Sequence, residues 1–336
     1  MPVTRATHLT RARLGGTVAL LAAALALSLL AAVLLGPVPV DLAVALGDPR
    51  SADHEILVYA RLPRVLLAAV VGAALGAAGS VLQGLLGNPL ADPNLLGVSA
   101  GAAVAGAIAI VAGADPVSLV VPWCAFAGAL ATVSFVYAVA RTHGRTSPHA
   151  ILLVGVVCNA LAASIIMLVN ALASYTEAQG VLFWIMGALS TQSYTLVGVA
   201  ALYVAVGSLL LVRYAAALNL LATGEEGAAA LGVDVDRVRR AVFVLASLLV
   251  GAAVSVSGMI NFVGLIVPHL LRLVVGPDQR LLLPASVLGG AAFLVWADAA
   301  ARTALAPAEL PVGVVTALLG GPFFLYLLRR SLRGER

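Results

Sequence analysis

The stretch GMINFVGLIVPHLLR, residues Gly258–Arg272, is apolar enough to cross a membrane but contains residues that weaken or interrupt a helix. Two glycines, an asparagine, a proline and a histidine lie among its aliphatic side chains. Glycine lets two helices approach closely, and proline removes a backbone donor from a helix. The stretch therefore indicates membrane helices that pack through small residues and break at defined points.

The composition of the whole chain indicates a polytopic membrane protein. Of its 336 residues, 62% are hydrophobic and only 10% are charged. A soluble domain is about 45–50% apolar and about 25% charged. A membrane β-barrel would show alternating strands of about ten residues, whereas the apolar runs here are continuous. We therefore predict an all-α fold.

Membrane helices need about 20 apolar residues each. We expect a single transmembrane domain over residues 1–336. The first apolar segment is longer than the core of a signal peptide and has no clear cleavage site, so we interpret it as a retained anchor. Residues 179–190 are too few to span, and we predict a short helix at the outer surface. The ten predicted spans are 15–36, 62–86, 95–112, 117–140, 148–170, 194–213, 238–255, 259–275, 281–301 and 311–329.

All 19 basic residues are arginines, and their distribution predicts the orientation. With the N-terminus inside, all of them fall on the inner side except Arg50, Arg61, Arg64 and Arg302. The positive-inside rule therefore predicts cytoplasmic N- and C-termini. The absence of lysine also excludes a Walker A loop and Schiff-base chemistry.

The chain repeats itself weakly. When residues 61–97 are shifted by 179 positions, eleven residues match, where we expect roughly four by chance; the matches include Gly72/Gly251 and Pro89/Pro268. The second span then corresponds to the seventh, and an offset of five spans reverses the direction of crossing. We predict an inverted repeat of spans 2–5 and 7–10. The two prolines are expected to end helices at symmetry-related places.

The loop at residues 213–240 contains TGEEGAAALG, which predicts a short capped helix. Thr223 and Glu226 have the spacing of a capping box, and Gly232 can supply a left-handed stop. Such a rigid helix could fit a groove in a partner protein. The alternative is a solvated loop helix.

Within this loop, EGAAALG (Glu226–Gly232) resembles the Glu-Ala-Ala-x-x-x-Gly coupling motif of ABC-importer permeases, with Gly227 in place of the first alanine. Further stretches resemble the iron-siderophore, haem and vitamin B12 permease family. Asn261 replaces a glycine that many relatives have. The resemblance covers most of the chain and is thinnest over residues 1–55 and 113–180. The stretches are RLPR (Arg61–Arg64), GNPLADPNLLGVSAGA (Gly87–Ala102), FVGLIVPHLLR (Phe262–Arg272), LLLPASVLGG (Leu281–Gly290), ADAAAR (Ala297–Arg302) and AELPVGVVTALLGGPFFLYLL (Ala308–Leu328).

The resemblance implies the permease subunit of a binding-protein-dependent ABC importer for a ferric siderophore, haem or cobalamin-type chelate, located in a bacterial cytoplasmic (inner) membrane. Such a pore has two permease subunits, either two copies of this chain or this chain with a related permease. An ABC ATPase dimer on its inner face would use ATP and Mg²⁺, and an extracytoplasmic substrate-binding protein would dock outside. The chain itself would catalyse nothing, bind no cofactor and contact lipid but no nucleic acid.

The resemblance also assigns roles to residues. Arg61, Arg64 and Arg302 would dock acidic side chains of the binding protein; alternatively they snorkel, or pair with Asp298, four residues before Arg302. Asn88 and Leu90 would line a cytoplasmic gate, or form a plain Asn-Pro turn. The coupling helix would consist of Thr223, Glu226, Ala228, Ala229 and Gly232.

Asn159 and Asn170 are eleven residues apart and share one helical face. We interpret them as candidates for the transport pathway, with an interhelical hydrogen bond as the alternative. His269 follows a proline and fits a structural cap better than a ligand. His, Cys, Asp and Glu do not cluster at metal-ligand spacing within the spans, so we predict no metal site and a bulky chelate as cargo.

The main alternative function is an ion-coupled secondary transporter. Ion coupling normally needs an acid inside the membrane, and the apolar interiors hold none; Asp298 and Glu309 lie near span ends. A membrane-embedded enzyme is disfavoured because HExxH and GxSxG motifs are absent. The identity of the chelate stays open.

Overall fold

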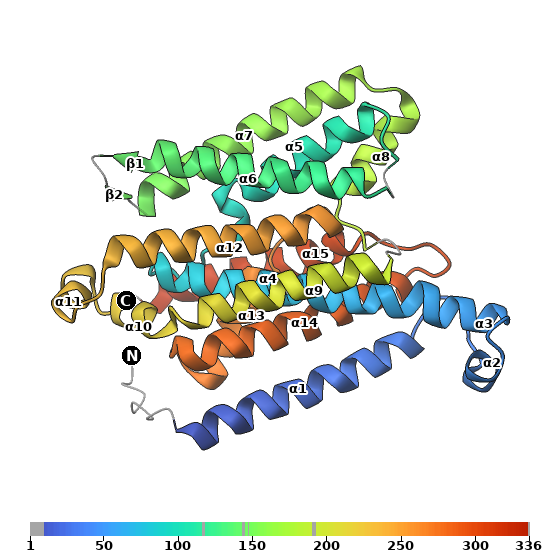
Figure 1. Ribbon diagram of the computed structural model, residues 1–336, viewed down its shortest axis with the longest axis horizontal. Coiled ribbons are helices and arrows are strands. Elements are labelled where there is room, and N and C mark those ends of the chain that lie inside the picture. Colours follow the sequence, from blue (N-terminus) through green and yellow to red (C-terminus); the bar gives the residue numbers. More distant parts are fainter. Residues whose placement is uncertain (1–9, 116–117, 143–144, 147, 190–192, 335–336) are drawn as a thin grey trace.

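The computed structural model describes residues 10–115, 118–142, 145–146, 148–189 and 193–334. Arg5, Arg336, Ser190 and residue 117, which the sequence interpretation used, lie outside these ranges. The described chain is an array of helices along one long axis (Figure 1). The helices are α1 (Arg11–Leu34), α2 (Leu42–Gly47), α3 (Ala52–His54), the π-helix η1 (Glu55–Arg61), α4 (Leu62–Leu85), the 3₁₀-helix η2 (Pro93–Leu96), α5 (Val98–Val111), α6 (Val120–Ala140), α7 (Pro148–Leu172), α8 (Tyr175–Ile185), α9 (Tyr194–Val212), α10 (Ala215–Leu221), α11 (Glu225–Ala230), α12 (Val235–Ser257), α13 (Val263–Val275), α14 (Gln279–Thr303) and α15 (Val312–Gly334). Strands β1 (Arg141–Thr142) and β2 (Arg145–Thr146) form a small antiparallel pair.

The all-α polytopic fold is confirmed. Among the described residues, eight helices are long and apolar enough to cross a membrane, and the shorter apolar helices α5 and α13 bring the set to the ten segments expected. The Gly258–Arg272 stretch contains a break between two helices. α12 ends at Ser257, Gly258 and Phe262 have φ angles of 66° and 68°, and α13 begins at Val263.

The order of helices supports the inverted repeat. α4 to α7 match α12 to α15, with the short helices α5 and α13 in equivalent places. α4 starts at the end of the molecule that carries α2 and α3, and α12 starts at the end that carries α10 and α11, so the two cross in opposite directions (Figure 1).

The predicted register of the repeat is wrong beyond α4. A constant shift of 179 would place the start of α5 at residue 277, next to the start of α14 rather than of α13. The connection after α4 covers residues 86–97, whereas the one after α12 covers only 258–262. The prolines are therefore not equivalent: Pro89 lies in a connection, and Pro268 lies inside α13 instead of ending a helix.

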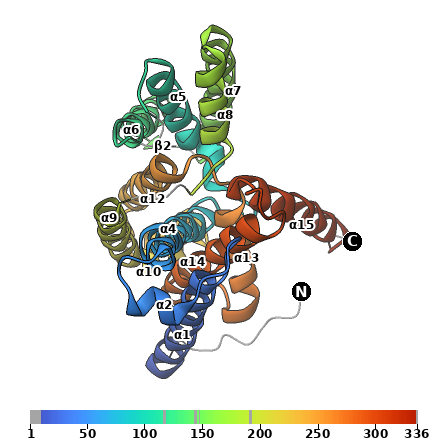
Figure 2. The same cartoon turned by 90° about the vertical axis from the view of Figure 1, so that its right-hand side faces the viewer.

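The core of the bundle is the contact of α4 with α14, and small residues make it possible (Figure 2). A Cβ atom on Gly72 would collide with the carbonyl oxygen of Gly290, and one on Gly76 would collide with that of Ser286. Gly79 approaches the backbone of Gly264 in the same way. The glycines therefore allow close backbone approach, as the sequence predicted.

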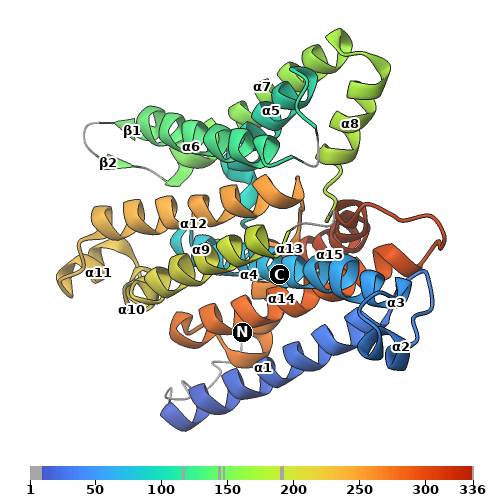
Figure 3. The same ribbon diagram turned by 45° about the vertical axis from the view of Figure 1, so that its right-hand side comes forward.

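Two peripheral helices complete the bundle (Figure 3). α1 packs along α14, where Trp296 Nε1 donates to Ser28 Oγ at 3.0 Å. The short helix expected at residues 179–190 is α8, which starts earlier, at Tyr175, behind a capping box of Ser174 and Glu177. It lies at the end that also carries α2 and α3 (Figure 3).

The predicted charge asymmetry has a structural counterpart. The start of α1, the strands β1 and β2, the α9–α12 loop and the α13–α14 turn all lie at the end of the molecule that carries α10 and α11 (Figure 1). These segments hold most of the described arginines, while Arg50, Arg61, Arg64 and Arg302 belong to the opposite end.

Candidate functional site

A cavity of about 520 Å³ lies between the two halves of the repeat. The first half contributes the connection after α4, the start of α5 and one face of α7. The second half contributes the α12–α13 break, α13 and Phe324 of α15. In transporters with inverted repeats, substrate sites lie at the repeat interface, and interrupted or unusually short helices mark them. α5 and α13 are the short helices here.

The polar wall of this cavity is a hydrogen-bonded network around Asp92 and Asn94. Asp92 accepts the backbone N–H of Asn94 at 2.8 Å and that of Phe262 at 3.3 Å. Asn94 Nδ2 donates to the carbonyl of Ile260 at 3.4 Å, and the Ser99 hydroxyl donates to Asn94 Oδ1. The network joins the α4–α5 connection to the α12–α13 break, and so joins the two halves of the chain.

Among the residues that the structure describes, Phe262 is the one non-glycine residue with a left-handed backbone. That conformation is uncommon for a bulky side chain and costs roughly 1–3 kcal/mol. The ring lines the cavity and packs on Gly320 of α15, where a Cβ atom would collide with it. The surrounding contacts therefore hold Phe262 at the cavity wall against its backbone preference.

Asn159 and Asn170 differ in what they contact. Asn159 lines the cavity and donates from Nδ2 to the carbonyl of Asn94 at 3.2 Å. Ala162, Ala163 and Ile166 continue its face of α7 along the cavity, but Asn170, one turn further on, is not in the lining. Its Oδ1 is buried without a hydrogen-bond partner among the described residues. For Asn159 the alternative expectation, a hydrogen bond between helical segments, is correct, and the residue also lines the cavity.

The candidate gate residues, Asn88 and Leu90, lie in a turn just before Asp92. Asn88 is exposed, and its Oδ1 accepts the backbone N–H of Leu90 at 2.9 Å. The Leu90 side chain lines the cavity. The plain-turn interpretation is therefore correct for the local geometry, and a gating role stays a prediction.

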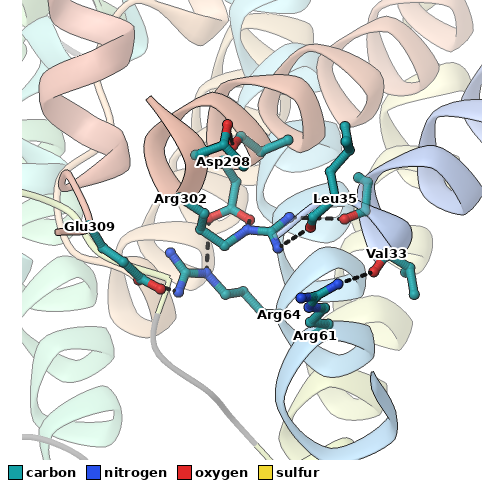
Figure 4. Close-up of polar contacts among 10 residues, drawn as sticks. Val33, Leu35, Arg61, Arg64, Asp298, Arg302 and Glu309 are labelled. Carbon is teal, nitrogen blue, oxygen red and sulfur yellow. Dashed lines mark hydrogen bonds and ion pairs between the residues drawn. The ribbon is translucent and has the colours of Figure 1, made fainter. Parts of the chain in front are cut away.

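The outer arginines Arg61 and Arg302 are not exposed. Their exposed fractions are 5% and 2%. Arg61 donates to the carbonyls of Val33 and Leu34 at 3.3 and 3.1 Å, and Arg302 donates to that of Leu35 at 2.9 Å (Figure 4). α1 ends at Leu34, so these guanidinium groups satisfy the open carbonyls at its C-terminus.

Asp298 is the centre of an ion-pair network in which Arg64 and Arg302 take part. Its side chain is fully buried; Arg64 Nε donates to Oδ1 at 3.0 Å and Arg302 Nε to Oδ2 at 2.9 Å. Arg64 also pairs with Glu309 at 2.6 Å (Figure 4). The expectation that Arg61 and Arg302 face outward is wrong in this conformation. Arg61 donates to backbone carbonyls, and Arg302 donates to a backbone carbonyl and to the buried carboxylate of Asp298. The alternative, a pair of Arg302 with Asp298, is confirmed.

The α10–α11 loop contains the predicted coupling helix with a different start. Thr223 donates its hydroxyl to the carbonyl of Leu220 at 2.7 Å and so closes the end of α10. The N-cap of α11 is Gly224, with no side-chain hydrogen bond. The predicted Thr223–Glu226 capping box is therefore wrong, because Thr223 already belongs to the last turn of the preceding helix.

The end of α11 is as predicted. Gly232 has a φ of 85°, and the N–H groups of Gly232 and Val233 donate to the carbonyls of Ala229 and Ala228 at 2.9 and 3.0 Å. This is a Schellman motif. Ala228 is buried against the rest of the loop, whereas Glu226 and Ala229 are exposed. The helix therefore offers a small, rigid, exposed surface.

Two polar contacts connect this loop to the bundle. Arg239 of α12, itself buried, pairs with Glu225 at the start of α11. Asn219 of α10 donates to Asp278 Oδ1 at 2.6 Å, at the start of α14. Asp278 lies outside the spans, and its hydrogen bond with the Arg280 guanidinium lowers its pKa to about 2. The sequence analysis missed these residues, although Asp278 directly before α14 was a recognisable N-cap signal.

Asp92 was the most consequential omission. The preceding Asn-Pro pair indicated a turn, and Asp92 lies outside the apolar runs in which an acid for ion coupling was expected. Asp92 nevertheless lines the cavity. Within the described ranges, no group of three or more His, Cys, Asp and Glu side chains could hold a metal ion. The rings of His269 and Phe323 meet edge to face, with their centroids 6.4 Å apart.

Comparison with known proteins identifies the family. The model of the FecCD transport family matches residues 20–330, which is more than nine-tenths of the chain. The chain belongs to the FecCD transport family. As a FecCD protein it is a multi-pass membrane permease of the ABC-importer class, and the all-α architecture with its short α5 and α13 is the fold of such a permease.

Relatives of this FecCD chain carry the names of importers for several chelates. It is 48% identical over 285 residues to the cobalamin import system permease protein BtuC of Halobacterium salinarum, covering 84% of this chain and 75% of that protein. It is 42% identical to the hemin transport system permease protein HmuU of Yersinia pestis, covering 83% and 85% of the two chains. A transporter assigned to the metal-chelate type of ABC transporter, solved in an inward-facing conformation, superposes with a TM-score of 0.83 at 30% identity, over 94% of this chain and 99% of that one.

Proposed function

We propose that this chain forms half of the pore of a binding-protein-dependent ABC importer for a ferric siderophore, haem or cobalamin-type chelate. The observation that carries the proposal is the cavity between the two repeat halves, at the break in Gly258–Arg272. Its lining is aliphatic and aromatic, with few polar groups: Asp92, Asn94, Ser99, Asn159 and Asn261. Such a wall fits a bulky organic chelate better than a bare ion, which needs several converging oxygen or nitrogen ligands.

The names of the relatives support this class of cargo. The similar permeases are named for cobalamin and for hemin, two large metal chelates. Because both lie above 40% identity, identity alone does not select one cargo for this chain.

We assign energy coupling to a separate ABC ATPase dimer, which would use ATP and Mg²⁺ while this chain binds neither. Two features support this assignment. The chain contains no lysine, so it cannot build a phosphate-binding P-loop of the Walker type. α11 lies at the tip of the α10–α12 loop, beyond the ends of α9 and α12 (Figure 3), where it could enter a groove in the ATPase.

We propose that a second permease, either another copy of this chain or a related one, completes the pore. The cavity lies between α7 and α15, and both helices expose large apolar side chains. Leu168 and Leu172 of α7 are 60% and 76% exposed, and Leu318 and Leu325 of α15 are 68% and 65% exposed. A partner that covers these faces would enclose the pathway.

We place the protein in the cytoplasmic membrane with both termini in the cytoplasm, because the arginine-rich segments gather at the α10–α11 end. The substrate-binding protein would then dock at the α2–α3 end. Since Arg61 and Arg302 are committed to internal contacts, we retain only Arg64, whose side chain is 15% exposed beside Glu309, as a docking arginine.

The test is uptake by the reconstituted transporter. The permease, its ATPase and its binding protein are placed in liposomes and supplied with haemin, cyanocobalamin or a ferric hydroxamate siderophore. We expect uptake of one class that requires ATP and stops when the Walker A lysine of the ATPase is replaced by alanine. Uptake driven by a proton or sodium gradient in liposomes that contain the permease alone would contradict the proposal and favour a secondary transporter.

A further inference from the structure

A second cavity, of about 610 Å³, lies between the end of α9 and the start of α12. Its polar rim contains three arginines, Arg213 directly after α9 and Arg237 and Arg240 in the first turns of α12. Its wall is apolar: Leu210 of α9 faces Ala241, Val244 and Leu245 of α12. We call this the α9–α12 groove. It is separate from the transport cavity and from the exposed surface of α11.

The rim of the α9–α12 groove is strongly positive. Its one acid, Asp234, is the N-cap of α12 and accepts the backbone N–H of Arg237 at 3.0 Å. Arg237 and Arg240 are three residues apart and share a helical face. In the described part of the chain, the structure shows Arg213, Arg237 and Arg240 exposed and in no ion pair. Three guanidinium groups and one carboxylate leave a net charge of about +2.

The neighbouring arginine shows that this arrangement is specific. Arg239 does not line the groove: it is buried and pairs with Glu225 and Asp236. Neighbouring arginines on α12 therefore have different contacts. Arg239 pairs with Glu225 of α11, whereas Arg237 and Arg240 line the groove.

The groove lies at the boundary of the apolar surface. The outer face of α9 exposes Leu202, Val206 and Leu209, with exposed fractions of 68%, 48% and 67%, and the helix ends at Val212. Tyr214 follows at the groove rim. A tyrosine between an apolar helix face and a row of arginines is typical of the membrane–water interface. In Figure 2, α9 lies at the edge of the bundle opposite α15, with α12 beside it on the inner side.

We propose that the α9–α12 groove binds an anionic phospholipid, with the phosphate on Arg213, Arg237 and Arg240 and an acyl chain along Leu210, Val244 and Leu245. Arginine forms paired hydrogen bonds with phosphate oxygens, and basic pockets between membrane helices bind anionic headgroups. A lipid fits better than a protein partner because the wall below the arginines is apolar and continues into the exposed face of α9.

Bound lipid would have a structural consequence for the loop that carries α11. Arg213 precedes the loop and Arg237 and Arg240 follow it, so one headgroup would tie its two ends together. This inference goes beyond the proposed function, because it names a ligand other than the cargo, and it does not depend on which chelate is carried.

The experiment measures lipid binding to the purified permease in nanodiscs and by native mass spectrometry. The lipid is phosphatidylglycerol, compared with phosphatidylcholine of the same acyl chains. The test variant is Arg213→Gln with Arg237→Gln and Arg240→Gln. The matched control, Arg11→Gln with Arg141→Gln and Arg329→Gln, removes three exposed arginines that do not line the α9–α12 groove. A second variant, Val244→Trp, fills the apolar wall without changing charge.

We expect wild-type protein and the control to retain phosphatidylglycerol selectively, and the test variant to bind it roughly tenfold or more weakly, since the phosphate loses three guanidinium partners. Val244→Trp should reduce binding at unchanged charge. Equal retention by the test variant and wild type would overturn the proposal, as would an equal loss in the control. Competition by inorganic phosphate alone, with no effect of Val244→Trp, would show an anion site and not a lipid site. If the test variant loses binding of the purified ATPase but keeps the lipid, the groove is a protein surface.

Discussion

The backbone N–H of Phe262 donates to the carboxylate of Asp92 at 3.3 Å, across 170 residues of sequence. The contact joins the α4–α5 connection to the α12–α13 break, and Phe262 is held there in a left-handed conformation. The two interrupted regions of the repeat therefore support each other through one carboxylate at the wall of the transport cavity.

Replacing this carboxylate should destabilise the cavity wall. Asp92→Ala leaves the partly buried N–H groups of Asn94 and Phe262 without their acceptor, and the cost of about 1–3 kcal/mol for a fully buried unsatisfied donor is the upper bound for each. We expect a lower thermal midpoint for the purified protein and faster hydrogen exchange at residues 258–262. Asp92→Asn keeps one acceptor oxygen and should have an intermediate effect.

The matched control is Asp48, which accepts the N–H of Arg50 at 2.9 Å in an exposed loop. Water can replace that acceptor, so Asp48→Ala should change stability by less than about 0.5 kcal/mol. If Asp92→Ala is as mild as Asp48→Ala, the Asp92 contact does not hold the break together.

The ion-pair network at the end of α14 predicts two very different effects for two acids. Asp298→Ala removes the fully buried carboxylate that Arg64 and Arg302 share, and breaking a buried ion pair from one side costs about 3–5 kcal/mol. Glu309 is 44% exposed, so Glu309→Ala should cost less than about 1 kcal/mol. Thermal unfolding in detergent compares them. Similar midpoints for the two variants would show that the stabilisation from these ion pairs does not depend on their burial.

The glycine contacts predict opposite signs for one kind of substitution. Gly198 of α9 has nothing near its Cβ position, so Gly198→Ala should be neutral or stabilise the helix by up to about 1 kcal/mol. Gly72→Ala would drive a methyl group into the carbonyl of Gly290, and overpacking costs about 1–3 kcal/mol or more. We expect lower stability and yield for Gly72→Ala only. Equal stability of the two variants would mean that the α4–α14 contact is looser than described.

The helices were predictable because apolar runs of about 20 residues determine membrane spans through local composition alone. The short helices α5 and α13 and the break at Gly258 also followed from local signals. The register of the repeat did not, because the connections 86–97 and 258–262 differ in length and no local pattern states which glycine faces which.

Side-chain partners were harder to predict than helices. The pair of Asp298 with Arg302 was visible at a spacing of four residues, but the partners Arg64 and Asp298 are 234 residues apart. Exposure of Arg61 was expected from its position at the end of a span, whereas the structure uses it to satisfy the carbonyl end of α1. Thr223 and Glu226 matched a capping box in spacing, yet Thr223 was already committed to the end of α10. Such competition between neighbouring elements is not encoded in spacing alone.

The last prediction concerns Gly232 and tests whether α11 transmits movement from the ATPase. Gly232 has a φ of 85°, and nothing lies within 4 Å of its Cβ position. A substitution there therefore changes only the backbone preference. Valine disfavours the left-handed region by about 1–2 kcal/mol, whereas asparagine tolerates it.

We expect Gly232→Val to disturb the Schellman turn and tilt α11, while the spans still insert and fold. In the reconstituted transporter, ATP hydrolysis should continue with strongly reduced uptake, and Gly232→Asn should retain most of both activities. Uptake and ATPase activity are measured on the same liposomes, with permease content checked by quantitative blotting. Because the site has room for either side chain, a loss with both variants would indicate that steric contact with the partner matters, not the turn. Normal uptake by Gly232→Val at normal expression would show that this helix end does not transmit the ATPase movement.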